Sequence, residues 1–194
     1  MDPQHEQQLV ARAIQGDRRA VERLWQLHRR WVAAVVLAHK PAEAEVDDLL
    51  QEVVLGLLDH IHELRDPTRL RSWLRVLARN TAVSSGRRAT TRRRFLRALG
   101  PADVSRPDPA AFDEERMAVR EATRRTLEAT EILTPDQREC LLLRAVKGMS
   151  QKKIAALLDI PETTVETRLA RARRRLRAAL TDEIPRPALA GRGR

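Results

Sequence analysis

The chain has 194 residues, and its 37 lysine and arginine side chains outnumber 27 acidic ones, which gives a formal net charge of +10. This excess of cations favours a polyanionic partner, with DNA or RNA as the first candidates. Tyrosine is absent and aromatic residues make up 3%, which argues against an RNA-binding module built on aromatic stacking. The single cysteine, Cys140, can form neither an internal disulfide nor a cysteine zinc site, so a reducing cytoplasm is expected.

The first forty residues predict two helices, at 4–15 and 18–39, separated by Gly16-Asp17. Their apolar residues recur at helical spacing, and we interpret Trp25 and Trp31 as core residues. The start of the chain is polar, and the longest apolar stretch, 31–38, is too short to span a bilayer. Neither a signal peptide nor membrane insertion is therefore expected.

A third helix is predicted at 44–62, with an apolar stripe that runs from Val46 to Ile61. Most of its polar residues lie off that stripe and form an acidic patch in a basic protein. They are Asp47, Asp48, Gln51, Glu52 and Asp59. From the chemistry alone, a solvated face and a docking face for a basic partner protein are equally good interpretations.

Residues 65–68 predict a turn, after which a helix is expected to run to about residue 94, with a break at Gly86. The later part of this segment is very basic and is suited to phosphate contacts. Its arginines are Arg87, Arg88, Arg92, Arg93 and Arg94. A flexible basic tail is the alternative, but the position next to a packed helix favours a nucleic-acid-binding face.

The segment 100–111 contains three prolines and few large apolar residues, which is typical of a linker. A helix is expected at 112–130, and the end of the chain after Leu180 is expected to be a loose basic tail. No strand pattern is found. We therefore predict an all-α protein with two small helical domains, at 1–96 and 113–181, joined by a flexible linker at 97–112 and followed by a tail at 182–194.

Residues 133–180 predict three helices, of which the last two form a helix-turn-helix. Thr134 and Gln137 form a capping box around Pro135 at the first helical position, and Gly148 ends that helix. Ser150 caps a short second helix, and Asp159-Ile160-Pro161 forms the turn before the third.

The third of these helices is amphipathic. Its buried face is predicted to contain Val165, Leu169, Ala172, Leu176 and Leu180. The opposite face carries Thr163, Thr167, Ala170, Arg171 and Arg174, a mixture of polar, small and cationic residues that suits a helix in the major groove. A helical hairpin with a solvated basic face is the alternative.

Three segments of the chain together resemble a known family, the group IV or extracytoplasmic-function (ECF) sigma factors of bacterial RNA polymerase. The segments are DDLLQEVVLGLLDHI at 47–61, SWLRVLARN at 72–80 and the helix-turn-helix at 133–176. The last also contains the family's continuation, TV-x-[ST]-R-x-x-R-[AG]-[RK], from Thr164 to Arg173. The resemblance implies sigma region 2 in the first domain and sigma region 4 in the second.

The resemblance also implies roles for particular residues. The acidic patch is expected to bind the β′ clamp helices of core polymerase through Asp47, Asp48, Gln51 and Glu52. The segment 65–94 is expected to recognise and melt the −10 element, and its loop at 65–71 to capture an extruded base. There we assign DNA contacts to Arg65, Asp66, Thr68, Arg69, Arg71, Asn80, Arg87 and Arg88. For reading the −35 element we assign Thr163, Glu166, Thr167, Arg168, Ala170, Arg171 and Arg174.

Two departures from the family pattern concern DNA recognition. Glu166 stands where the family often has lysine or arginine, and it could accept a hydrogen bond from a cytosine amino group. Ser84-Ser85 replaces an acidic residue that commonly follows the Asn80 position. The family's minimal form fits this chain, and because such members are often held inactive by an anti-sigma factor, one is an expected partner.

The leading hypothesis is thus a promoter-specificity subunit that is cytoplasmic, is not an enzyme and needs no cofactor or metal. A stand-alone helix-turn-helix regulator would explain 133–180 equally well, but it would leave the acidic patch and the segment 65–94 unexplained. A third hypothesis is an adaptor that keeps the sigma-like fold without promoter activity.

Overall fold

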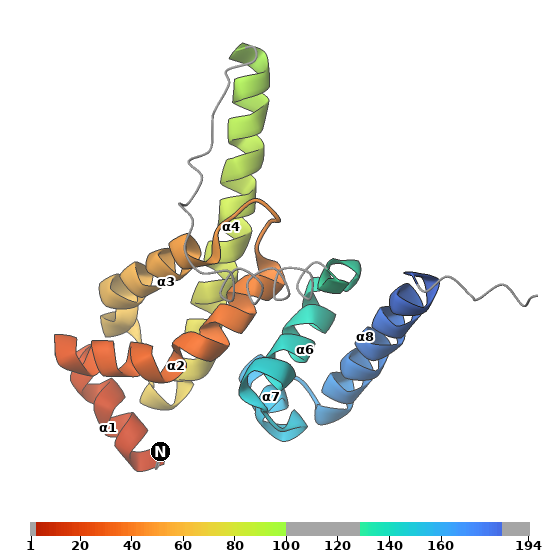
Figure 1. Ribbon diagram of the computed structural model, residues 1–194. Coiled ribbons are helices and arrows are strands. Elements are labelled where there is room, and N and C mark those ends of the chain that lie inside the picture. Colours follow the sequence, from red (N-terminus) through yellow and green to blue (C-terminus); the bar gives the residue numbers. More distant parts are fainter. Residues whose placement is uncertain (1–2, 100–128, 184–194) are drawn as a thin grey trace, which may run out of the picture.

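The computed structural model describes residues 3–99 and 129–183, and all the regular elements within these ranges are helical. The N-terminal domain (3–99) contains α1 (Pro3–Ile14), α2 (Arg18–His39), α3 (Val46–His60), η1 (Ile61–Glu63), η2 (Pro67–Arg69) and α4 (Leu70–Leu99). The C-terminal domain (129–183) contains η3 (Thr130–Ile132), α6 (Pro135–Lys147), α7 (Gln151–Leu158) and α8 (Glu162–Glu183). The prediction of an all-α chain with a helix-turn-helix is confirmed (Figure 1).

Side-chain caps define the ends of the C-terminal helices as the sequence predicts. Thr134 and Gln137 form the reciprocal capping box at the start of α6, with both hydrogen bonds at 3.4 Å. Gly148 ends α6 in the left-handed region with φ +58°. Ser150 Oγ accepts a hydrogen bond from the amide of Lys153 and so caps α7.

The expected break at Gly86 is wrong, because α4 is continuous from Leu70 to Leu99. Glycine within a helix costs only about 1 kcal/mol relative to alanine, and the residues around Gly86 supply the helical hydrogen bonds on both sides. The C-terminal part of α4 projects beyond the rest of the bundle (Figure 1). Residues 100–128 and 184–194, which include most of the predicted linker, most of the predicted helix at 112–130 and the tail, lie outside the described residues.

The two domains pack directly against each other. The main contact joins α2 to α6, and a second contact joins α4 to α7 (Figure 1). The buried apolar residues of both domains form one continuous cluster, in which Trp31 is 5% exposed and Cys140 is fully buried. Burial raises the pKa of the Cys140 thiol, so this side chain acts as a small hydrophobic residue.

A carboxylate is buried in this interface between domains. Glu139 of α6 is 0% exposed. Its Oε1 and Oε2 accept hydrogen bonds from Arg75 Nε at 2.7 Å and Arg75 Nη2 at 2.9 Å. His39 Nε2 lies 3.0 Å from Oε2. Burial by itself would raise the pKa of the Glu139 carboxyl, but the bonds from His39 and Arg75 outweigh it and lower the pKa.

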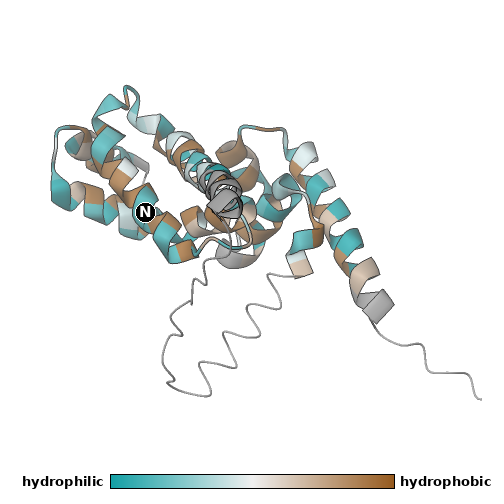
Figure 2. Cartoon of the chain, turned by 90° about the horizontal axis from the view of Figure 1, so that it is seen from above, coloured by the Kyte–Doolittle hydropathy of each residue, from teal (hydrophilic) through white to brown (hydrophobic). Residues whose placement is uncertain are grey.

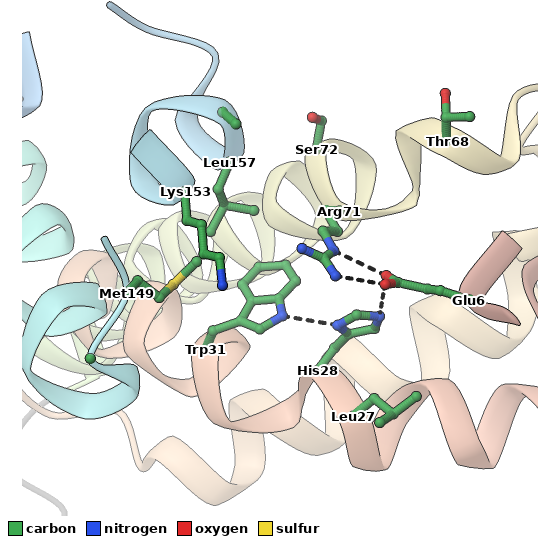
Figure 3. Close-up of a pocket in the computed structure, with 12 residues that line it drawn as sticks. Glu6, Leu27, His28, Trp31, Thr68, Arg71, Ser72, Met149, Lys153 and Leu157 are labelled. Carbon is green, nitrogen blue, oxygen red and sulfur yellow. Dashed lines mark hydrogen bonds and ion pairs between the residues drawn. The ribbon is translucent and has the colours of Figure 1, made fainter. Parts of the chain in front are cut away.

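A second polar network ties α1 to α2 and α4 within the N-terminal domain (Figure 3). Trp31 Nε1 donates to His28 Nδ1 at 3.0 Å, which leaves the proton of a neutral imidazole on Nε2. That nitrogen lies 3.3 Å from Glu6 Oε1. Arg71 donates to both oxygens of Glu6, at 3.0 and 2.6 Å. The network therefore fixes the start of α4 against α1.

None of the helices within the described ranges has the length and apolar composition that a membrane span requires.

The Glu6 carboxylate predicts a specific loss of stability in acid. The contact with His28, against the effect of burial and together with Arg71, lowers the pKa of Glu6 from 4.5 to about 2. Because this pKa is lower in the folded state, the stabilisation is complete above about pH 4.5 and is lost as the pH falls through 2. Because Arg71 is half-exposed and water screens its charge, we expect the Glu6 carboxylate to contribute only about 1–3 kcal/mol to the free energy of unfolding.

We expect Glu6→Gln to remove this part of the pH dependence between pH 5 and pH 2, as measured by urea unfolding across that range. Glu22→Gln, which removes an exposed carboxylate of α2, is the matched control. Equal pH dependence in Glu6→Gln and the parent protein would show that the network does not stabilise the fold.

Candidate polymerase-binding and DNA-binding surfaces

The predicted polymerase-binding residues form one exposed face of α3. Helical spacing places Asp47, Asp48, Gln51 and Glu52 side by side, and all four are exposed. The helix buries Leu49, Val53 and Leu57 on its other side, at 2%, 0% and 0% exposure. The α3 helix therefore presents the acidic patch to solvent because its apolar stripe packs into the bundle.

Two exposed leucines continue the acidic face along α3. Leu55 is 57% exposed and lies three residues after Glu52 and four after Gln51, and Leu58 is 44% exposed and lies three residues after Leu55. The sequence analysis did not identify them as surface residues. The sequence did offer a signal, because the apolar stripe predicted for this helix does not include these two leucines. An exposed patch that combines carboxylates with leucines is typical of a protein-binding surface.

The predicted −10 residues on α4 lie on a second exposed face. Asn80 and Arg87 are both exposed and seven residues apart. Val76 and Val83 share their face, with exposed fractions of 50% and 37%. These valines were missed by the sequence analysis, although the spacing 76, 80, 83 and 87 marks one side of a helix. For Arg88 the structure describes the helical backbone only.

The loop at 65–71 has a defined internal structure. Asp66 Oδ1 accepts hydrogen bonds from the amide and the hydroxyl of Thr68, at 2.9 and 2.7 Å, and these bonds lower the pKa of Asp66. Arg65 and Arg69 are exposed, and Arg69 Nε lies 3.6 Å from Asp66 Oδ2. Arg71 differs from these arginines because its guanidinium is bound to Glu6. The loop thus presents cations on a frame that the Asp66 turn holds in place.

The predicted −35 residues lie along the exposed side of α8. Figure 2 shows α8 at the right, with hydrophilic and hydrophobic residues alternating along it as in an amphipathic helix. Its buried residues are Val165, Leu169 and Ala172, each at most 1% exposed. Six of the seven predicted contact residues are exposed, and they are Thr163, Glu166, Thr167, Ala170, Arg171 and Arg174. Thr167 Oγ1 donates to the carbonyl oxygen of Thr163 at 2.8 Å, so this hydroxyl already has an acceptor.

Arg168, the seventh residue, lies away from this face. Its Nη2 donates to Asp136 Oδ2 at 2.8 Å, and its side chain is 24% exposed. The contact joins α8 to the first turn of α6. Arg175 adds to it by donating to Gln137 Oε1 at 3.3 Å. These bonds fix the direction in which α8 presents its exposed side.

A cavity of about 540 Å³ lies between the domains (Figure 3). The N-terminal domain contributes Trp31, Thr68 and Arg71 to its wall, and the C-terminal domain contributes Met149 and Lys153. Two residues of the predicted −10 loop, Thr68 and Arg71, therefore line this cavity, and both remain exposed. Within residues 3–99 and 129–183, no cluster of three or more His, Cys, Asp or Glu side chains could hold a metal ion.

Family comparisons agree with this division into two domains. The family described as Sigma-70 region 2 matches residues 24–93, and the family described as Sigma-70, region 4 matches residues 123–176. The first match covers α3 and most of α4. It spans the acidic face and residues 65–93, which a stand-alone helix-turn-helix regulator would leave unexplained.

Whole-chain relatives lead to the same family. The ECF RNA polymerase sigma-E factor of Escherichia coli K12 is 31% identical over 179 residues, which cover 87% of this chain and 90% of the relative. The structure of CnrH in complex with the cytosolic domain of CnrY matches with a TM-score of 0.63 and 27% identity, over 92% of this chain and 99% of that chain.

A third match supports the fold alone. The sigma factor RpoE in complex with the anti-sigma factor NepR, from Bartonella quintana, gives a TM-score of 0.52 at 23% identity, over 84% of this chain and 96% of that chain.

The two region families and the sigma-E relative establish what kind of protein this is: the chain belongs to the ECF sigma factors of the sigma-70 family and is an RNA polymerase sigma factor.

Proposed function

We propose that this sigma factor binds core polymerase through the exposed face of α3 and reads promoter DNA with two surfaces that lie on separate domains. The observation that carries the proposal is the division of exposed polar residues. One set lies on η2 and α4 of the N-terminal domain, and the other lies on α8 of the C-terminal domain. Two tethered readers gain affinity because the first contact raises the effective concentration of the second.

Core binding on α3 combines charge with apolar contact. Asp47, Asp48, Gln51 and Glu52 provide attraction to a basic partner helix, which speeds association and fixes its orientation. Leu55 and Leu58 extend the same face and provide area that can be removed from water on binding. The β′ clamp helices of core polymerase are the partner that the family resemblance assigns to this face.

Recognition of the −10 element uses the loop at 65–71 and the exposed side of α4. Arg65, Arg69 and Arg87 contribute cations for the phosphates, and Asn80 can hydrogen-bond to a base edge. The exposed Val76 and Val83 offer apolar contacts to bases that leave the duplex. Arg88 belongs to this set by its position on α4, whereas Arg71 positions the loop through its contact with Glu6.

Recognition of the −35 element uses α8 in the major groove. Arg171 can pair with guanine, and Ala170 allows close approach to a thymine methyl group. Glu166 can accept from a cytosine amino group, which is a base preference that a basic residue at this position would not give. Thr163, Thr167 and Arg174 flank these residues on the same exposed side.

The remaining features follow from this assignment. The protein itself performs no catalysis, acts in the cytoplasm where the polymerase works, and has an anti-sigma factor as a further partner. Among the similar structures, RpoE is in complex with the anti-sigma factor NepR, and CnrH is in complex with the cytosolic domain of CnrY. We keep 1–96 as region 2, 97–112 as linker, 113–181 as region 4 and 182–194 as a basic tail.

Reversal of charge on α3 is expected to abolish holoenzyme formation. Asp48→Arg with Glu52→Arg places two cations on the face that should meet a basic partner, while both side chains are exposed and the fold is retained. Binding of fluorescently labelled protein to purified core polymerase measures the effect. Glu22→Arg with Glu131→Arg makes the same charge change at exposed positions elsewhere and should leave binding intact. Normal binding by the α3 variant would remove this face from the interaction.

Two arginines of the loop at 65–71 are expected to have different roles, one in recognition of the −10 element and the other in stability of the fold. Arg69→Ala should weaken or change −10 preference without lowering the melting temperature, because Arg69 is exposed with only a long contact to Asp66. Arg71→Ala should lower stability, because it removes the bidentate partner of Glu6. In vitro transcription from promoters mutated singly in each element, with melting curves, measures both effects. A change in −35 preference in the Arg69→Ala variant would contradict the proposal that two independent surfaces recognise the two DNA elements.

Arg171→Ala is expected to weaken promoter use by about 1–3 kcal/mol and to relax preference at one base pair of the −35 element. Arg30→Ala removes the same charge from an exposed position on α2 and provides the control for net charge. Holoenzyme binding to a promoter selected from a random library is the measurement. Equal losses for the two variants would assign Arg171 to general electrostatics instead of base reading.

A further inference from the structure

Two arginines of α8, Arg168 and Arg175, bind residues at the start of α6 or just before it. Arg168 Nη2 donates to Asp136 Oδ2 at 2.8 Å. Arg175 Nη1 donates to Gln137 Oε1 at 3.3 Å and to the carbonyl oxygen of Ile132 at 3.5 Å. The start of α6 therefore holds α8 at two points.

The two points of attachment are well separated along α8. Arg168 and Arg175 are seven residues apart, which corresponds to about 10 Å along the helix axis. Gln137 is itself held in place, because its Oε1 also accepts a hydrogen bond from the amide of Thr134 in the capping box, at 3.4 Å. One contact would leave α8 free to pivot, whereas two contacts at this spacing fix both its rotation and its position along α6.

The apolar contact between the same helices has no comparable directional effect. α8 buries Val165, Leu169 and Ala172, each at most 1% exposed. Apolar burial is favourable but non-directional, so a small rotation or shift of α8 would keep most of it. Hydrogen bonds depend on both distance and angle. The bonds to the start of α6 are therefore the part of the contact that selects one rotation of α8.

These bonds matter more for the direction of α8 than for the stability of the fold. The side chain of Asp136 is 48% exposed and that of Arg168 is 24% exposed. Ion pairs that water reaches contribute little to the free energy of unfolding. A binding surface is more demanding, because its groups must be held within about 0.5 Å of the productive geometry. Arg171 lies one helical turn from Arg168, so a rotation of α8 that breaks the Arg168 bond moves Arg171 as well.

From these observations we propose that Asp136 and Gln137 are positioning residues for recognition of the −35 element. They set the rotation of α8 and, through it, the base pairs that Arg171 and its neighbours contact. This role rests on the proposed function, because it concerns the DNA-reading face of α8. Arg168 and Arg175 then act by holding the helix and not by binding DNA.

A double-mutant cycle on the holoenzyme tests this role. The variants are Asp136→Ala, Arg168→Ala and the double variant, with Arg175→Ala to test the second point of attachment without removing the capping box. Asp136→Glu keeps the carboxylate, and Glu131→Ala removes an exposed carboxylate elsewhere in the C-terminal domain. Each protein is assembled with purified core polymerase. Its affinity is measured for one promoter and for promoters in which each −35 base pair is changed singly, and circular dichroism melting checks the fold.

We expect Asp136→Ala, Arg168→Ala and Arg175→Ala to reduce discrimination between the promoter and its −35 variants, by about threefold or more for the first two. The double variant should lose no more than either of its single variants, because both remove the same bond. Asp136→Glu and Glu131→Ala should retain the discrimination of the parent protein. A role in stability alone would lower the melting temperature and leave discrimination unchanged.

Two results would overturn the positioning role. One is full −35 discrimination by Asp136→Ala or Arg168→Ala, in whichever of them melts like the parent protein. The other is an additive loss in the double variant, which would show that Arg168 binds DNA directly. Arg171→Ala, measured in the same assay, tests the proposed function separately, because unchanged discrimination in that variant would contradict reading of the −35 element by α8.

Discussion

A single buried carboxylate determines how the two halves of this protein meet. Glu139 lies on the helix that supports the helix-turn-helix, and it is neutralised by residues of the other domain. A charge in that position would be strongly unfavourable without its partners, so packing of the domains must bring Arg75 and His39 against it. The apolar contact of α2 with α6 buries surface between the domains, and the ion pairs of Glu139 make that contact specific.

The same helices that pack the interior leave the functional faces in water. On α3, burial of Leu49, Val53 and Leu57 turns the carboxylates outward. On α8, burial of Val165, Leu169 and Ala172 turns Arg171 outward, and the Arg168–Asp136 bond fixes the helix on α6. The domain contact leaves both of these faces exposed.

Local sequence signals predicted the local structure well. The capping box at Thr134, the stop at Gly148 and the cap at Ser150 all depend on residues within a few positions of each other, and all are confirmed. Gly86 misled the prediction because a glycine alone does not end a helix whose neighbours continue it. The sequence placed Leu55 and Val76 off the main apolar stripes of their helices, but it could not give how exposed they are, because a helical wheel does not say how much of each side the other helices cover.

The interdomain ion pairs lay beyond sequence reasoning for a different reason. His39, Arg75 and Glu139 are separated by 36 and 64 positions, and no periodic pattern relates them. Nothing in the sequence distinguishes Arg71 and Arg168 from the arginines that we propose to contact DNA. The folded chain nevertheless pairs them with Glu6 and Asp136. Only the three-dimensional arrangement distinguishes arginines that are paired with a carboxylate of another helix from the exposed arginines that we propose to contact DNA.

The central claim is that one chain reads two DNA elements with surfaces on two separate domains. Run-off transcription by purified core polymerase on a pool of random promoters, followed by sequencing of the templates used, tests it most directly. We predict transcripts that depend on this protein, from templates with two separate blocks of preferred sequence. A single preferred block, or the absence of transcripts that depend on this protein, would contradict the claim.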